Sequence, residues 1–127
     1  MTSLYETVGG ELFFERLVDR FYEGVVSDDV LLRLYPEPND LSGARKRLTL
    51  FLMQYWGGPT TYSDERGHPR LRQRHFPFAI GEREKDHWLT HMCQAIDEVS
   101  PNDEIRSQLT EYVKNAATHL VNQPPSV

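Results

Sequence analysis

Apolar residues recur at helical spacing along most of the chain. The first long pattern starts near Glu11 and is typical of an amphipathic helix with a wide apolar face. The side chains expected to point from this helix into a core are Leu12, Phe13, Phe14, Leu17, Val18, Phe21, Tyr22 and Val25. Similar patterns predict helices over residues 41–55, 80–99 and 105–120. Since no run alternates apolar and polar residues for long, we expect an all-α fold.

Capping signals place the ends of the first elements. Ser3 followed by Glu6 predicts a capping box for a short first turn, which Gly9 and Gly10 interrupt. Ser27 and the two aspartates after it end the first long helix and can cap a short segment over residues 30–34.

Proline and glycine divide the middle of the chain. Tyr35-Pro36-Glu37-Pro38 predicts a corner, because proline removes an amide donor and disfavours helix in the residue before it. Gly57-Gly58-Pro59 ends the next helix. Residues 60–69 show no strong period and are predicted to be a loop, followed by one or two helical turns over residues 71–75. Ser100-Pro101 predicts the cap and first turn of the last helix.

The length of 127 residues suits a single domain over residues 1–127, and we expect its tail to be disordered from about residue 122, where a Pro-rich end begins. The formal net charge of -5 argues against general nucleic-acid binding but permits a local basic patch. The longest apolar stretch, Leu48–Met53, is far short of the roughly 20 residues of a membrane span. A single cysteine, Cys93, cannot form an internal disulfide, which favours a cytoplasmic location; we expect its thiol to be inert.

Four of the five histidines have ordinary interpretations. His87 and His91 are four residues apart, so both rings share one helix face at a spacing that metal sites use. A zinc site needs three or four ligands, however, and the chain has no His-Glu-x-x-His motif and no cysteine pair. His68 and His119 are expected to be solvated surface groups.

The fifth histidine, His75, ends the short basic helix and is followed directly by Phe76-Pro77-Phe78. Its ring can project from a rigid corner into an apolar cleft. Judged by its sequence neighbours alone, His75 could equally be a packed structural histidine.

A series of motifs over nearly the whole chain resembles the truncated haemoglobins, and more narrowly their group II, or O-type, branch. The residues that carry this resemblance are Val8-Gly9-Gly10, Arg20-Phe21-Tyr22, Gln54-Tyr55-Trp56-Gly57-Gly58-Pro59, Arg66-Gly67-His68-Pro69-Arg70-Leu71-Arg72, Arg74-His75, Pro77-Phe78 and Trp88. The resemblance implies a truncated globin fold, a two-over-two helical sandwich around haem b. The two long helices before residue 56 would face the two after residue 80.

The resemblance also implies roles for single residues. His75 matches the proximal iron ligand, whose other ring nitrogen should donate to a nearby backbone carbonyl. Tyr22, Tyr35 and Trp88 match the ligand-facing positions, and all three side chains can donate a hydrogen bond. The remaining pocket residues are Ala44, Leu48 and Phe51 on the ligand side, with Arg47, and after it Arg72 and His68, as candidates to pair with the haem propionates.

These features predict a haem protein that reversibly binds dioxygen and other diatomic ligands such as carbon monoxide and nitric oxide, with oxygen release slowed by the distal hydrogen bonds. An enzymatic alternative is peroxidase or nitric oxide dioxygenase activity, which would need a separate reductase. A non-haem helical interaction module, whose aromatic residues only fill a core, is the third hypothesis. An exposed aromatic such as Tyr62 could serve a homodimer.

Overall fold

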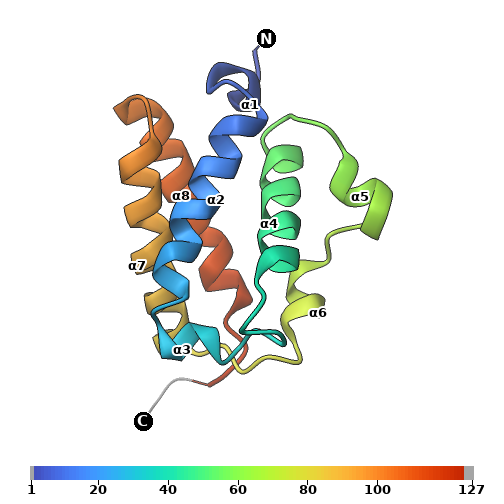
Figure 1. Cartoon of the computed structure of the whole chain (residues 1–127), viewed down its shortest axis with the longest axis vertical. Helices are drawn as coiled ribbons and strands as arrows, with labels where there is room; N and C mark the ends of the chain where they lie inside the picture. The colour runs from blue at the N-terminus through green and yellow to red at the C-terminus, as the bar shows by residue number, and fades with distance from the viewer. Residues whose placement is uncertain (1, 125–127) are drawn as a thin grey trace.

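A computed structural model describes residues 2–124 of the chain and contains only helices there. The four long patterns form four long helices, as predicted (Figure 1). Short helices occupy the turns between them. The elements are α1 (Leu4–Thr7), α2 (Glu11–Val25), α3 (Asp29–Leu32), α4 (Ser42–Tyr55), α5 (Thr61–Arg66), α6 (Leu71–His75), α7 (Glu82–Val99) and α8 (Asp103–Leu120).

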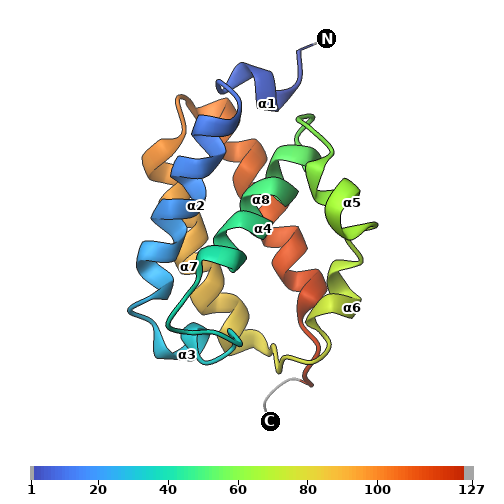
Figure 2. The same cartoon turned by 45° about the vertical axis from the view of Figure 1, so that its right-hand side comes forward.

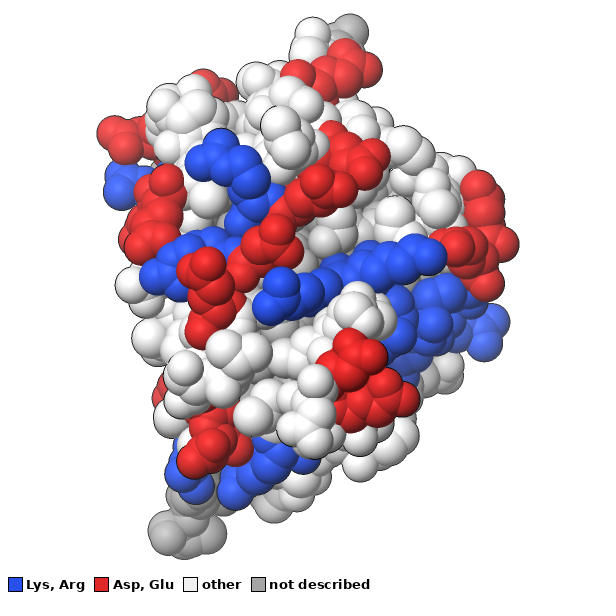
Figure 3. All heavy atoms as spheres, in the orientation of Figure 1, with Lys and Arg blue, Asp and Glu red and all other residues white. Residues whose placement is uncertain are grey.

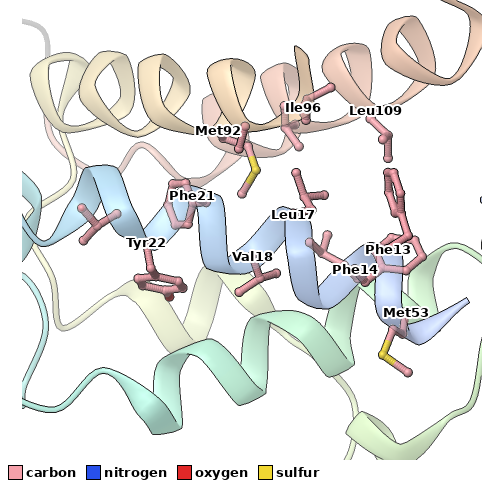
Figure 4. Packing of buried hydrophobic residues seen from close by; sticks show 14 of the residues in the cluster. Phe13, Phe14, Leu17, Val18, Phe21, Tyr22, Met53, Met92, Ile96 and Leu109 are labelled. Atoms are coloured by element: carbon pink, nitrogen blue, oxygen red, sulfur yellow. The ribbon is translucent and has the colours of Figure 1, made fainter. Parts of the chain in front are cut away.

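The core is built around α2, which lies between α4 on one side and the α7–α8 pair on the other (Figure 4). The α2 side chains that are buried in this core are Phe13, Phe14, Leu17, Val18, Phe21, Tyr22 and Val25. They pack on Met92 and Ile96 of α7 and Leu109 of α8 (Figure 4). Leu12 departs from the prediction, since its side chain is 67% exposed on the opposite face of α2.

Two of the predicted helix caps are present, and both start short helices. The Ser3 side chain accepts a hydrogen bond from the Glu6 N–H at 3.2 Å, and Asp28 accepts one from Val30 N–H at 3.0 Å, so both predicted caps are present. The predicted cap at Ser100 is wrong. The side chain of Asn102 accepts from Ile105 N–H at 2.9 Å instead, because an asparagine two residues later offers a better-placed acceptor.

One predicted loop contains a helix. Residues 61–66 form α5, although their sequence shows no helical period. Contacts with α4 hold it: Gln54 Nε2 donates to Ser63 Oγ at 2.7 Å, and Ser63 N–H donates to Gln54 Oε1 at 3.0 Å. Tyr62 is only 4% exposed and packs edge-on against Phe51, so it is not the exposed aromatic that a dimer surface would need.

The predicted tail begins next to Asn122, whose side chain bonds to the chain between α6 and α7. Asn122 donates to the carbonyls of His75 and Phe78, at 3.2 and 2.8 Å, and its side-chain oxygen accepts from Ile80 N–H at 3.0 Å. Asn122 therefore holds the segment between α6 and α7. Residues 125–127 lie outside the described residues.

The short helix α5 packs on α4 and α6 packs on α8, both on the side of the fold away from α2 and α7 (Figures 1 and 2). Four half-buried side chains pack against the core without being enclosed by it: Ala44, Leu48, Phe51 and Trp88. In the described residues, no helix is both long enough and apolar enough to cross a membrane.

Candidate functional site

The ring of His75 is held by the backbone of its own helix. Its Nδ1 lies 2.6 Å from the carbonyl oxygen of Leu71, one turn earlier in α6. A neutral imidazole that donates from Nδ1 keeps Nε2 unprotonated, which is the form that coordinates a metal. The predicted bond to a backbone carbonyl is therefore present, and Nε2 is the nitrogen available to an iron.

The α6 segment is short and needs support, because a five-residue helix is unstable by itself. Arg74 supplies it by donating to the carbonyls of Pro69 and Arg66, at 2.7 and 2.8 Å. The backbone at Arg70 adopts a left-handed conformation with φ of 43°, which turns the chain into α6. Together with the Asn122 bonds, these contacts fix the place of His75.

Two of the three predicted donors lie together. The Tyr35 hydroxyl donates to the Tyr22 hydroxyl at 3.5 Å, and the rings meet edge to face with centroids 5.9 Å apart. Burial raises the pKa of Tyr22, and burial raises that of Tyr35 much further, so both phenols stay protonated and can donate.

The third predicted donor, Trp88, is half-buried on α7. Phe21 joins it to the tyrosines, because the Phe21 ring lies 5.4 Å from the Trp88 ring and 4.9 Å from the Tyr22 ring. The three predicted donors thus share one aromatic cluster, with Phe21 as the ring that connects Trp88 to the tyrosines.

Arg45 is a contact that sequence reasoning missed. Its guanidinium carbon lies 5.6 Å from the centroid of the Tyr22 ring, and its Nη1 lies 3.6 Å from Asp19 of α2. A cation over a phenol face is attracted by the ring quadrupole. Nothing in the sequence marks this pair, since the two residues belong to helices whose relative rotation is decided only by packing.

The candidates for propionate binding differ in what they already contact. Arg72 donates from Nη1 to the carbonyl of His119 at 2.7 Å, and His68 Nδ1 accepts from Arg70 N–H at 3.1 Å. Arg47 is exposed on α4, where its charge and that of Arg45 partly oppose the burial that raises the pKa of Tyr22. Arg47 is therefore the candidate on the tyrosine side.

His87 and His91 are both engaged with one carboxylate. His87 Nδ1 lies 2.9 Å and His91 Nε2 lies 2.7 Å from the same oxygen of Asp28. Burial works to raise the pKa of Asp28, but the bonds from His87 and His91 outweigh it and lower that pKa to about 2. Within residues 2–124, no group of three histidine, cysteine or acidic side chains has the arrangement of a metal site.

Burial raises the pKa of the Cys93 thiol, which disfavours a reactive thiolate.

A groove of about 580 Å³ runs between α8, the end of α4 and α6. Tyr55 and Tyr112 stack across it with centroids 4.0 Å apart, and Leu71, whose carbonyl holds His75, belongs to its wall. The buried indole nitrogen of Trp56, also in this wall, has no hydrogen-bond partner among the described residues. His75, Tyr22 and Trp88 lie outside its lining, so the groove meets the candidate site only at Leu71.

These residues fit a haem. The face formed by Ala44, Leu48 and Phe51 is apolar and half-buried, as the lining of a cofactor pocket is. His75 offers one ring nitrogen in the required form, and the aromatic cluster around Tyr22 offers hydrogen-bond donors.

The chain is similar in sequence and in fold to known proteins. The bacterial-like globin family matches residues 3–122. The chain is 44% identical to group 2 truncated hemoglobin YjbI of Bacillus subtilis, over 94% of this chain and 88% of that protein.

Two solved structures are similar to the chain over nearly its whole length. A thermostable hemoglobin from the actinobacterium Thermobifida fusca superposes with a TM-score of 0.94 at 56% identity, covering 98% of this chain and all 100% of that one. A truncated oxygen-avid haemoglobin from Bacillus subtilis superposes with a TM-score of 0.88 at 41% identity, covering 95% of this chain and 100% of that one.

Proposed function

The chain belongs to the bacterial-like globin family, as a truncated haemoglobin of group II, and we propose that it holds haem b through His75 and binds dioxygen reversibly, with slow release. Haem-based ligand binding follows from the family. The proximal residue, the distal donors and the slow release are the parts that we propose for this chain.

The observation that carries the proposal is the bond between His75 Nδ1 and the Leu71 carbonyl at 2.6 Å. It fixes the tautomer and the orientation of the ring, and a backbone acceptor on the second nitrogen is the usual partner of an iron-ligating histidine. The sequence has no Cys-x-x-Cys-His motif for covalent attachment, which favours non-covalent haem b. When bound, the haem supplies an iron with one open position for a diatomic ligand.

The distal residues support slow oxygen release. Tyr22, Tyr35 and Trp88 can each donate a hydrogen bond, and burial keeps both phenols protonated. Bound dioxygen carries partial negative charge, so a hydrogen bond to it contributes about 1.5–3 kcal/mol and slows release about tenfold to hundredfold. The similar haemoglobin of Bacillus subtilis is described as oxygen-avid, and we propose the same property here.

The test is the absorption spectrum of the purified protein after reconstitution with haem, beside His75→Ala and the control His119→Ala. We expect an intense haem band that shifts with carbon monoxide in the wild type and in His119→Ala, and its loss in His75→Ala. His75→Gly should recover the band when free imidazole is added, because imidazole can take the place of the missing ring. A normal haem band in His75→Ala would remove His75 as the ligand.

The same preparations separate binding from turnover. If peroxide and an aromatic donor react no faster with the protein than with free haem, the peroxidase alternative is rejected. A wild-type protein that folds without haem and does not bind added haem would favour the interaction module instead.

A further inference from the structure

The charge of the molecule is divided unevenly along the chain. Residues 41–81 contain seven Lys and Arg and two Asp and Glu, for a formal charge of +5. The rest of the chain contains seven Lys and Arg and seventeen Asp and Glu, for a formal charge of -10. The net value of -5 therefore hides a basic part and a strongly acidic part.

The basic part is one side of the fold. Its exposed side chains are Lys46, Arg47, Arg66, Arg70 and Arg72, which we call the basic sector. They belong to α4, α5 and α6 and to the turn before α6; α5 packs on α4, and α5 and α6 follow the same side of the fold (Figure 2). On the face that Figure 3 shows, blue side chains gather over α4 and α6, whereas over α2 blue and red groups alternate.

Local contacts leave most of this charge uncompensated. In the described part of the chain, the sector's one ion pair is Lys46 with Glu65 at 3.7 Å, between two exposed side chains, and such a pair contributes little. Arg72 bonds to a backbone carbonyl, which satisfies its donors without cancelling its charge. Because these arginines form no ion pair among the described residues, their charge is available to an outside partner.

The sector also borders both elements of the candidate haem site. Arg47 precedes Leu48 on α4, and Arg72 precedes His75 by three residues on α6. A bound haem would add two negative propionates, and residues 41–81 would still carry about +3. The excess is therefore larger than propionate binding requires.

We propose that the basic sector is the docking surface for a small acidic electron-carrier protein of the iron–sulfur class. This inference rests on the proposed function, because its purpose is to return ferric haem iron to the ferrous state that binds dioxygen. The carrier's reduced cluster loses one electron and the haem iron gains it; no bond is made or broken and no proton moves. Opposite charges steer such partners together and raise association rates by about 10 to 1,000-fold.

The distribution of charge favours a small protein over an extended polyanion. The basic sector is confined to α4–α6, while the rest of the chain carries a formal charge of -10. A nucleic acid or an anionic membrane that extends beyond the sector meets this acidic surface and is repelled. A compact acidic protein can contact the sector alone.

The experiment uses the haem-loaded protein and an acidic [2Fe–2S] ferredoxin as the probe. Two double variants are compared, Arg66→Glu with Arg70→Glu in the sector and Arg16→Glu with Arg106→Glu outside it. Both change the net charge equally, so a difference between them reports location and not overall charge. Binding is measured by calorimetric titration, and reduction of the ferric protein under carbon monoxide is measured by stopped flow.

We expect the sector variant to lose at least about tenfold in affinity and in the bimolecular reduction rate at low salt, and the outside variant to lose much less. The difference should shrink as salt rises, since the screening length falls to about 3 Å at 1 M. Equal losses in the two variants, or rates that ignore salt, would overturn the proposal. So would a tighter, sector-dependent affinity for duplex DNA or anionic vesicles.

Haem binding by the purified proteins distinguishes a failure of the proposed function from a failure of the docking surface. If the wild type shows no haem band, the proposed function fails. If all the proteins bind haem and carbon monoxide normally while the two variants dock alike, only the docking surface is wrong.

Discussion

Single residues of the same type have different partners in this molecule. His75 contacts its own helix through Leu71, whereas His87 and His91 contact Asp28 and His68 contacts the Arg70 amide. In the unfolded chain, each of these imidazole rings has both polar and apolar neighbours, and these neighbours do not distinguish one ring from another. The difference arises because only His75 combines a backbone acceptor for Nδ1 with a second nitrogen for a metal.

Tyr22→Phe removes the most buried of the proposed distal donors, and we expect dioxygen to leave about tenfold to hundredfold faster. Tyr35→Phe should have a smaller effect, because its hydroxyl reaches Tyr22 only at 3.5 Å. Stopped-flow displacement of dioxygen by carbon monoxide measures the rates. Tyr112→Phe, in the α8 groove, is the matched control, and an effect of Tyr22→Phe no larger than the control's would contradict the distal role.

At the scale of elements, one carboxylate joins three of them. Asp28 ends the α2–α3 turn, caps α3 through Val30 N–H, and accepts from two histidines of α7. Because α7 also carries Trp88, this contact fixes α3 and the corner after it relative to the aromatic cluster.

The pH dependence of stability follows from this link. The pKa of Asp28 is lowered from 3.8 to about 2 in the folded protein, so its charge stabilises the fold above pH 3.8 and this stabilisation is lost as the pH falls toward 2. Asp28→Asn keeps a good cap residue but removes the charge. We expect it to lower the free energy of unfolding by up to about 2 kcal/mol at pH 6, and by little at pH 2.

Urea denaturation at both pH values measures this difference. Asp29→Asn is the control, because Asp29 is an exposed neighbour in the same turn, and we expect a change under about 0.5 kcal/mol. A cost for Asp28→Asn that stays the same from pH 6 to pH 2 would contradict the ionic link.

Two helical glycines should respond oppositely to alanine. A Cβ on Gly24 of α2 would lie well under 3.0 Å from the His91 ring, closer than Cβ contacts occur, whereas a Cβ on Gly43 of α4 would first meet the flexible end of Arg47 at 3.0 Å. Gly24→Ala should therefore destabilise the protein by about 1–3 kcal/mol despite a better helix propensity. Gly43→Ala should stabilise it by about 0.5–1 kcal/mol. Thermal denaturation of the two variants checks the prediction, and the same sign of change for both would refute it.

At the scale of the whole molecule, the buried residues are unevenly distributed among the helices. The structure buries seven residues of α2, two of α4, Leu52 and Met53, and none of α6. The apolar face of α4 is only half-covered by protein, and the short α6 depends on polar contacts. The side of the fold that would enclose a cofactor is thus its least buried side.

Haem binding should accordingly protect one side of the molecule. In the haem-free protein we expect α6 amides to exchange fastest with solvent, because local opening costs least where few apolar contacts are lost. Added haem should slow exchange in α6 and α4, since it binds the folded form. Amides of α2 should be protected in both states. Hydrogen-exchange mass spectrometry measures this order, and exchange of α2 before α6 would contradict it.

The sequence by itself determined the long helices, the corner and the family. Helical periodicity is a local property, and proline, glycine and capping side chains act within a few residues, so these features can be predicted without neighbours. The motif series around His75 led to the prediction of a haem, which helical periodicity alone does not give.

Only the tertiary structure decided which distant residues meet. Asp28 bonds to histidines 59 and 63 residues later, Arg45 lies over Tyr22, and Tyr62 becomes buried when α5 packs on α4. The physical reason is the same in each case: such contacts depend on how helices rotate and pack against one another, and no local pattern records that rotation.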